Sequence, residues 1–293
     1  MPKNSNPTAL HGEHGLAELT PAGQPKVRDI SLQGRPHAAR HPKRVAITSP
    51  RDRPGVIETT SRALYASRSQ RGPLTVSSPK AKGRLGCESA LESLFVAAAS
   101  FDDRVLAITA QPVVIELRSG LSAQNLAQMT KVLADQGIAR SHARLWFVDF
   151  EVRTTPSHER VLVEVKPDRR AGRLVELMEE RRAACARLGA RFLLVKDTDF
   201  PEPLASNLRI LQRYADHPVS ADITALVQAA AAQKITRFDT LAEGAGCGFE
   251  ALYALVATGM LDADLRVQPL NPRAMLRAPS GERRAWLPFR EEA

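Results

Sequence analysis

The stretch VLVEVKPDRR, residues 161–170, alternates apolar and polar side chains in the way that is typical of a half-buried β-strand. Because successive side chains of a strand point to opposite faces, its three valines share one face, while Glu164 and Lys166 share the other. Pro167 then ends the strand. The pattern predicts a strand whose valines face a core and whose last two charged side chains lie together at the edge of a sheet.

A second strand is predicted just upstream, in RLWFVDFEVRT, residues 144–154, and the TPSHE that separates the two runs fits the loop of a hairpin. Antiparallel pairing brings Asp149 close to Glu164. Two converging carboxylates repel each other unless a divalent cation lies between them, and their oxygens suit Mg²⁺ or Mn²⁺. A neighbouring Lys166 can orient or deprotonate the attacking water, or stabilise charge on a phosphate. The alternative is two strands whose outward face is simply charged.

Upstream of the hairpin, the pattern predicts a helix, a bent strand and a second helix. CESALESLFVAAASF, residues 87–101, has apolar residues at helical spacing, with Glu88 and Glu92 four residues apart on one face. RVLAITAQPVVIEL, residues 104–117, is typical of a strand pair or a bent strand interrupted by its proline. Residues 122–137 are expected to be helical, with the serine as N-cap and the glycine at the end.

After the hairpin, a helix in residues 171–190, a strand in 191–197 and a helix in 204–215 complete the pattern. The element order α-β-β-(α)-β-β-α-β-α predicts an α/β fold with a mixed sheet flanked by helices.

Four short motifs occur in order along this part of the chain: an ES-x-LE helix containing Glu92, then Gln111-Pro112, Asp149-Phe150 and Glu164-Val165-Lys166. With the Asn207–Tyr214 helix, they make residues 86–214 resemble the catalytic domain of the TnsA-like transposon endonucleases, in the PD-(D/E)XK nuclease superfamily. The resemblance implies a restriction-endonuclease-like mixed sheet over residues 81–217.

The resemblance also implies a role for each motif residue. Glu92, Asp149 and Glu164 are expected as metal-side carboxylates, Lys166 as the catalytic lysine, and Gln111 as a supporting polar residue. The implied cofactor is Mg²⁺, with Mn²⁺ as a substitute. The implied reaction is phosphodiester hydrolysis at the 5′ ends of a cut-and-paste transposon, with a separate transposase and an AAA+ ATPase regulator as partners.

The sequence departs from the family pattern in two places. Val148 stands where the family has a proline, a position that supplies backbone shape and no ligand. Residues 122–137 look like an insertion that alters DNA approach or partner docking. Glu88 is expected on a solvated helix face, because Glu92 fits the family position.

Basic residues follow the predicted active strand at Arg169, Arg170 and Arg173. Such side chains bind phosphate backbones without reading sequence. The alternative for each is a solvated first turn of the next helix.

Residues 218–293 are expected to form a separate winged-helix-like unit with a flexible tail. Three short helices are predicted, followed by a small wing or trailing strand in residues 261–272. The third helical run, GFEALYALVATGM, carries a single charged residue, which makes it a poor reader of the major groove. Protein docking is therefore favoured here over DNA reading, and the resemblance implies docking to the AAA+ regulator.

The basic charge of the chain is concentrated at its start. Residues 1–86 hold 15 Lys and Arg against 5 Asp and Glu, a net +10, whereas residues 87–293 hold 26 against 27, a net −1. Residues 1–80 are therefore expected to be a disordered basic arm that attracts nucleic-acid phosphates, the alternative being a tail or misassigned start without a role.

Three scattered cysteines without a CxxC pair argue against disulfides or structural zinc and favour a reducing cytoplasm. The resemblance implies that this is a bacterial cytoplasm and that the protein lies near the nucleoid. No apolar run is long enough to span a bilayer, so no membrane partner is expected.

Two other functions are compatible with the same motifs. One is a stand-alone PD-(D/E)XK nuclease for defence or repair, which would cut DNA without partners. The other is a non-catalytic adaptor that binds DNA or protein, against which the intact acidic residues and Lys166 argue.

Overall fold

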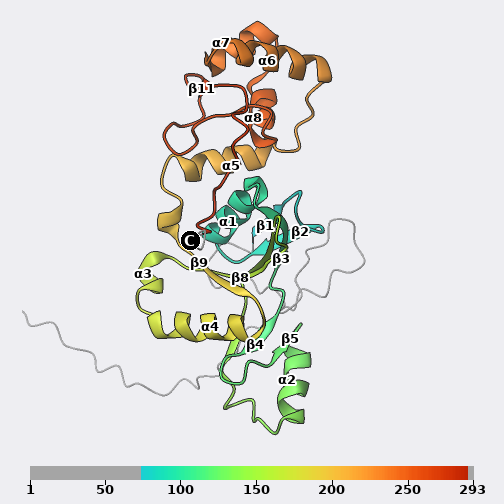
Figure 1. Cartoon of the computed structure of the whole chain (residues 1–293), viewed down its shortest axis with the longest axis vertical. Helices are drawn as coiled ribbons and strands as arrows, with labels where there is room; N and C mark the ends of the chain where they lie inside the picture. Colours follow the sequence, from blue (N-terminus) through green and yellow to red (C-terminus); the bar gives the residue numbers. More distant parts are fainter. Residues whose placement is uncertain (1–73, 290–293) are drawn as a thin grey trace, which may run out of the picture. The chain divides into compact units, whose positions relative to one another are not determined.

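The computed structural model describes residues 74–289, and a mixed four-stranded sheet organises them (Figure 1). Across the sheet the strands are β3 (Val105–Ala110), β7 (Phe150–Thr154), β8 (Arg160–Val165) and β9 (Arg191–Val195). β7 is antiparallel to both β3 and β8, whereas β9 is parallel to β8. The predicted α/β class is confirmed, and so is the hairpin between β7 and β8.

The two faces of the sheet are covered by different helices. The three valines of β8 belong to a large apolar core with α1 (Ala90–Phe101) and α5 (Leu204–Tyr214). Leu162, on the other face, packs in a smaller cluster with Ala184 and Cys185 of α4 (Val175–Arg187). The predicted alternation along residues 161–165 is therefore confirmed, and the charged end of β8 lies on the α4 face.

Beyond the central sheet, β3 and β7 continue into a second, three-stranded sheet of order β5-β4-β6. Its strands are β4 (Val114–Glu116), β5 (Ser122–Ala123) and β6 (Leu145–Phe147). The predicted helix of this region is shorter than expected: α2 (Leu126–Asp135) begins after Asn125, whose side chain accepts from the Gln128 N–H. Ser122 is not the N-cap, because it belongs to β5 and pairs there with Ile115 of β4.

Regular structure is found earlier in the chain than the sequence predicts. β1 (Leu74–Ser77) and β2 (Arg84–Cys87) form an antiparallel hairpin whose Val76 and Leu85 are buried in the main core. Four-residue strands give too short a pattern to be recognised. The rest of the predicted arm, residues 1–73, lies outside the described residues, as do residues 290–293.

Three helices follow α5 as predicted: α6 (Ala221–Gln233), α7 (Phe238–Ala245) and α8 (Phe249–Ala257). Two-residue strands β10 (Thr236–Arg237) and β11 (Met275–Leu276) pair antiparallel. In the expected wing, residues 261–272, only Asp262 pairs, in a bridge with Arg277. The shorter elements α3 (Asp168–Ala171) and the 3-10 turn η1 (Asp197–Asp199) flank α4 and β9.

The loop after α8 is held by one buried side chain of α5. Asn207 is fully buried, and its amide nitrogen donates to the carbonyls of Leu265 and Gln268 at 2.9 and 2.8 Å. Its amide oxygen accepts from the Leu270 N–H at 2.7 Å. The main apolar core also includes residues of both α5 and α8, so packing continues across the boundary predicted at residue 217.

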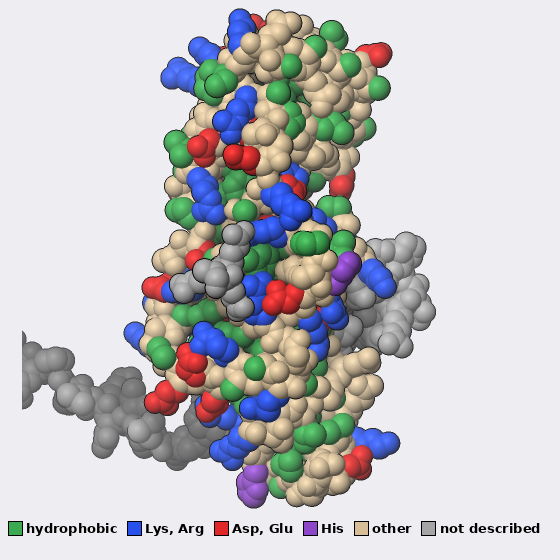
Figure 2. Space-filling view, in the orientation of Figure 1, with side chains coloured by type: hydrophobic (Ala, Val, Ile, Leu, Met, Phe, Trp, Pro, Cys, Tyr) green, Lys and Arg blue, Asp and Glu red, His purple; other side chains and the backbone are tan. Residues whose placement is uncertain are grey.

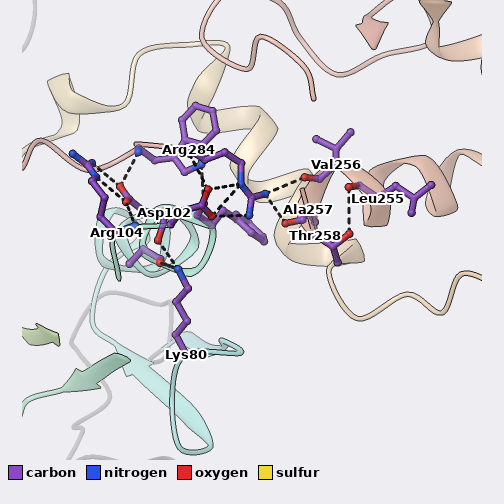
Figure 3. A network of polar contacts seen from close by, with 12 residues as sticks. Lys80, Asp102, Arg104, Leu255, Val256, Ala257, Thr258 and Arg284 are labelled. Carbon is purple, nitrogen blue, oxygen red and sulfur yellow. Dashed lines mark hydrogen bonds and ion pairs between the residues drawn. The ribbon is translucent and has the colours of Figure 1, made fainter. Parts of the chain in front are cut away.

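The segment expected as a flexible tail lies against the end of α1 (Figure 3). The buried carboxylate of Asp102 accepts from the N–H groups of Trp286 and Leu287, both at 2.8 Å, and from the Arg104 side chain. Arg284 pairs with Asp103 at 3.0 Å and also donates to the carbonyls of residues 256 and 257 at the end of α8. These contacts hold residues 284–287 against the ends of α1 and α8. No helix within residues 74–289 has the length and apolarity to cross a membrane.

Candidate active site

Gln111 directly follows β3 and Asp149 directly precedes β7, and the chain bends at both residues. β3 pairs with β7 in the central sheet, whereas their neighbours in sequence, β4 and β6, pair in the second sheet. Gln111 at the bend has a left-handed backbone, φ 46°, which costs a non-glycine residue about 1–3 kcal/mol. Its N–H donates to the Asp149 carbonyl at 2.9 Å, which joins the two bends. Asp149 therefore lies at the corner where the chain passes from one sheet to the other.

The side chain of Asp149 reaches the end of β8. Because Phe150 pairs with Val163, the register places Asp149 beside Glu164. Asp149 Oδ2 accepts from the Val165 N–H at 2.9 Å and from Lys166 Nζ at 3.0 Å. Burial raises the pKa of Asp149 to about 6, and the nearby Glu164 charge adds to this while Lys166 opposes it.

Lys166 bridges the two carboxylates of the hairpin. Besides its bond to Asp149, its Nζ lies 2.5 Å from Glu164 Oε1. Burial alone would lower the pKa of Lys166, but Asp149 and Glu164 outweigh this and raise it. The lysine is therefore a cation at neutral pH, suited to donating hydrogen bonds and stabilising negative charge rather than to removing a proton.

Glu164 is enclosed by donors. It is 1% exposed, and its Oε2 accepts from Trp146 Nε1 at 2.7 Å. Arg181 of α4 reaches its Oε1 at 2.7 Å, and the guanidinium carbon of Arg181 lies 5.1 Å from the centroid of the Trp146 ring. Trp146 and Arg181 were not predicted as site residues. The signal in the sequence was indirect, since a glutamate in a buried strand requires partners.

Glu92 lies at the start of α1, close enough to Asp149 for their charges to interact. Burial raises the pKa of Glu92 to about 7, with a further rise from Asp149. Its carboxylate also helps to cap α1: it accepts from the Ser89 hydroxyl at 3.0 Å and the Glu88 N–H at 2.7 Å, while Ser89 accepts from the Glu92 N–H at 3.2 Å. The pattern Ser-x-x-Glu in the sequence is the signal for this second role of Glu92.

Gln111 contacts Glu88 before the start of α1. Its Nε2 lies 3.3 Å from Glu88 Oε1. The prediction that Glu88 shares a helix face with Glu92 is wrong, because Ser89 caps α1 and the helix starts at Ala90. Glu88 itself is exposed, as expected.

The three predicted phosphate-binding arginines follow Lys166 closely in sequence. Arg169 and Arg170 lie in α3, and Arg173 lies in the turn before α4. All three are exposed. They are therefore accessible to a polyanion.

The residues fit a divalent cation in part. Among residues 74–289, no three Asp, Glu, His or Cys side chains are arranged as a metal-binding group. Asp149 and Glu92 suit a hard cation, because their charges repel each other and Asp149 Oδ1 has no hydrogen-bond partner within the described range. Glu164 fits less well as arranged, because its oxygens are bonded to the cationic Lys166 and Arg181 and to Trp146, whereas the donors to Glu92 are a neutral hydroxyl and a backbone N–H.

Comparison with known proteins does not assign this chain to a family. A scan against models of known protein families finds no match, and a search of curated proteins finds no similar sequence.

Proposed function

We propose that this chain is a Mg²⁺-dependent DNA endonuclease of the PD-(D/E)XK type that cuts at the 5′ ends of a cut-and-paste transposon. One observation carries the proposal: Lys166 Nζ lies between Asp149 and Glu164 at a sheet corner, with Glu92 nearby. The transposon context rests on the motif resemblance alone.

The proposed reaction is hydrolysis of a phosphodiester. Asp149 and Glu92 hold the cation, which when bound supplies Lewis-acid activation and stabilises the leaving 3′ oxygen. Lys166, kept cationic by its two carboxylates, donates to the attacking water or to a phosphate oxygen and so fixes the approach. A water oxygen bonds to phosphorus, the P–O3′ bond breaks, and the 3′ oxygen receives a proton.

The arrangement of elements supports a restriction-endonuclease-like core. The mixed sheet is covered by α1 on one face and by α4 on the other. The proposed acidic residues come from the start of α1, the corner before β7 and the end of β8. Catalytic side chains from separate rigid elements are held in fixed positions, as a nuclease site requires.

In this proposal, basic side chains position the DNA at the site by contacting its phosphate backbone. Arg169, Arg170 and Arg173 bind phosphates without reading bases. Figure 2 shows Lys and Arg side chains interspersed with Asp and Glu over the face drawn, in keeping with the near-neutral balance of residues 87–293. The described surface is thus suited to positioning DNA more than to attracting it over a distance.

We assign residues 218–289 to partner docking in a winged-helix-like unit. β10 lies between α6 and α7 in sequence, and β11 and the Asp262–Arg277 bridge follow α8, an order that supports the winged-helix assignment. Six of the nine α8 residues are buried, and α8 packs against α5, so α8 is not presented to a DNA groove. Leu226, Ile235 and Val267 are 57–75% exposed and offer apolar contacts for a protein partner.

The proposal is tested with wild type and an Asp149→Asn variant on supercoiled plasmid carrying transposon ends, with Mg²⁺ and with the transposase and AAA+ ATPase that the proposal requires. Wild type should nick the DNA, and Asp149→Asn should lose at least about a thousandfold in rate while still binding DNA. Asp135→Asn, on the exposed surface of α2, is the matched control. Equal cleavage by Asp149→Asn would show that the site is assigned wrongly.

Whether cleavage requires the partner proteins distinguishes a transposition endonuclease from a stand-alone nuclease. Efficient cutting by the purified chain alone would favour defence or repair. A well-folded wild type that binds neither Mg²⁺ nor Mn²⁺ would favour the non-catalytic adaptor.

A further inference from the structure

Arg181 of α4 extends its side chain into the site. That side chain is 12% exposed, whereas that of the neighbouring Arg182 is 57% exposed and pairs with Glu179 on the surface. Arg181 stacks over Trp146 and pairs with Glu164. Since Trp146 also donates to Glu164, the indole and the guanidinium hold the same carboxylate from two sides.

The contacts with Trp146 and Arg181 limit the ability of Glu164 to bind a cation. Its Oε1 is shared by Arg181 and Lys166, and its Oε2 accepts from Trp146. A dication bound to Glu164 would lie within a few ångströms of two positive side chains in a buried setting, where like charges repel strongly. Asp149 keeps one carboxylate oxygen without a partner within residues 74–289.

We propose that Arg181 is a positioning residue: it keeps Glu164 away from the cation and makes it the anchor that fixes Lys166 against Asp149. The inference rests on the proposed nuclease function and assigns the cation to Asp149 and Glu92. Lys166 Nζ then has two fixed carboxylate acceptors, and its third donor goes to the Val165 carbonyl at 3.1 Å, a place that a substrate oxygen would have to take.

The inference is tested by titrating Mn²⁺ alone into the full chain, with bound metal followed by electron paramagnetic resonance. Glu164→Gln should keep Mn²⁺ affinity within about twofold, because Glu164 is not a ligand and the amide oxygen still accepts from Lys166 and Arg181 while only Trp146 loses its acceptor, whereas Asp149→Asn should weaken it about tenfold or more. Arg181→Met should strengthen Mn²⁺ binding about fivefold, since it removes a positive charge and frees Glu164. That gain should vanish in the Arg181→Met/Glu164→Gln double variant.

Cleavage provides a second readout. Arg181→Met should bind Mn²⁺ more tightly yet cut DNA more slowly, because Lys166 loses its fixed anchor, and a purely structural arginine would not produce that split. Arg182→Met is the matched control and should behave as wild type in both assays. Circular dichroism checks folding, and Arg181→Gln replaces Arg181→Met if the methionine variant does not fold.

Two results would overturn the inference while leaving the nuclease proposal intact. One is a drop of Mn²⁺ affinity in Glu164→Gln as large as in Asp149→Asn, which would make Glu164 a ligand. The other is a folded Arg181→Met protein with wild-type Mn²⁺ affinity and cleavage. Failure of wild type itself to bind Mn²⁺ would instead contradict the proposed function.

Discussion

The groups around each charged side chain at the sheet corner determine its contacts and how readily it ionises. Lys166 is kept cationic by two carboxylates, and Glu164 is held by three donors. Glu92 and Asp149 are different, because burial and neighbouring negative charge make ionisation unfavourable for both. A site that raises the pKa of two acids together gains free energy when a cation binds them.

The raised pKa of Glu92 predicts a pH-dependent stability. Without metal, the folded protein holds a proton on Glu92 up to about pH 7, whereas the unfolded chain releases it near 4.5. Stability contributed by this group is full below pH 4.5 and is lost as the pH rises through 7. In EDTA, the free energy of unfolding by urea should therefore fall between pH 5 and pH 8, and Glu92→Gln, whose amide oxygen can still accept from the Glu88 N–H, should flatten that fall.

Metal binding should show the opposite trend. Glu92 and Asp149 must lose their protons to bind a cation, so Mn²⁺ affinity should rise as the pH increases from 6 to 7. Exposed Glu243→Gln is the control for both measurements. A Glu92→Gln protein whose stability and metal affinity follow the wild-type pH curves would contradict the placement of Glu92 in the site.

At the scale of elements, local patterns in the sequence predict local structure. The apolar stripes of α1 and α5 and the alternation of β8 are visible in single windows, and these elements form as predicted. The bend at Gln111 is different, because its positive φ and its bond to Asp149 depend on two strands separated by the whole second sheet. Arg181 likewise reaches Glu164 only after α4 has packed on the sheet, so no spacing rule could identify it.

Substituting Asn207 tests how α5 holds the loop after α8. Asn207→Ala leaves two buried carbonyls and one N–H without their partner, which should cost about 3 kcal/mol in the free energy of unfolding. Arg213→Ala, exposed on the same helix, should change stability little. Urea denaturation measures both, and a near-neutral Asn207→Ala would mean that the loop does not depend on this side chain.

Asp102 holds residues 286 and 287 in place by accepting hydrogen bonds from their backbone N–H groups. Asp102→Ala removes the shared acceptor of Trp286, Leu287 and Arg104 and should cost about 3 kcal/mol, because two backbone N–H groups and a partly buried arginine lose their carboxylate partner. The amides of Trp286 and Leu287 should then exchange with deuterium much faster. Unchanged protection of these amides, with wild-type stability, would show that the segment is held by its apolar contacts instead.

At the scale of the whole molecule, charge and chemistry are separated along the chain. The proposed site lies within residues 87–293, whose net charge is −1, whereas residues 1–86 carry +10. Under the proposed function, a nearly neutral part that carries the site would have little long-range attraction for DNA, and the basic residues 1–86 would supply that attraction in a salt-dependent way. Association and cleavage are therefore expected to respond to different parts of the chain.

Deleting residues 1–73 tests this separation, because it removes 12 Lys and Arg against 5 Asp and Glu while keeping β1 and everything after it. DNA association should weaken, and the slope of log K against log salt should become shallower by about 0.9 for each phosphate that the shortened chain no longer neutralises. Cleavage of bound DNA at low salt should persist, since no proposed catalytic residue is removed. The triple variant Arg169→Gln, Arg170→Gln, Arg173→Gln is the contrasting control: it should slow cleavage by misplacing the bound backbone, with a smaller change in slope. Equal salt slopes for the full and shortened chains would mean that residues 1–73 have no part in DNA binding.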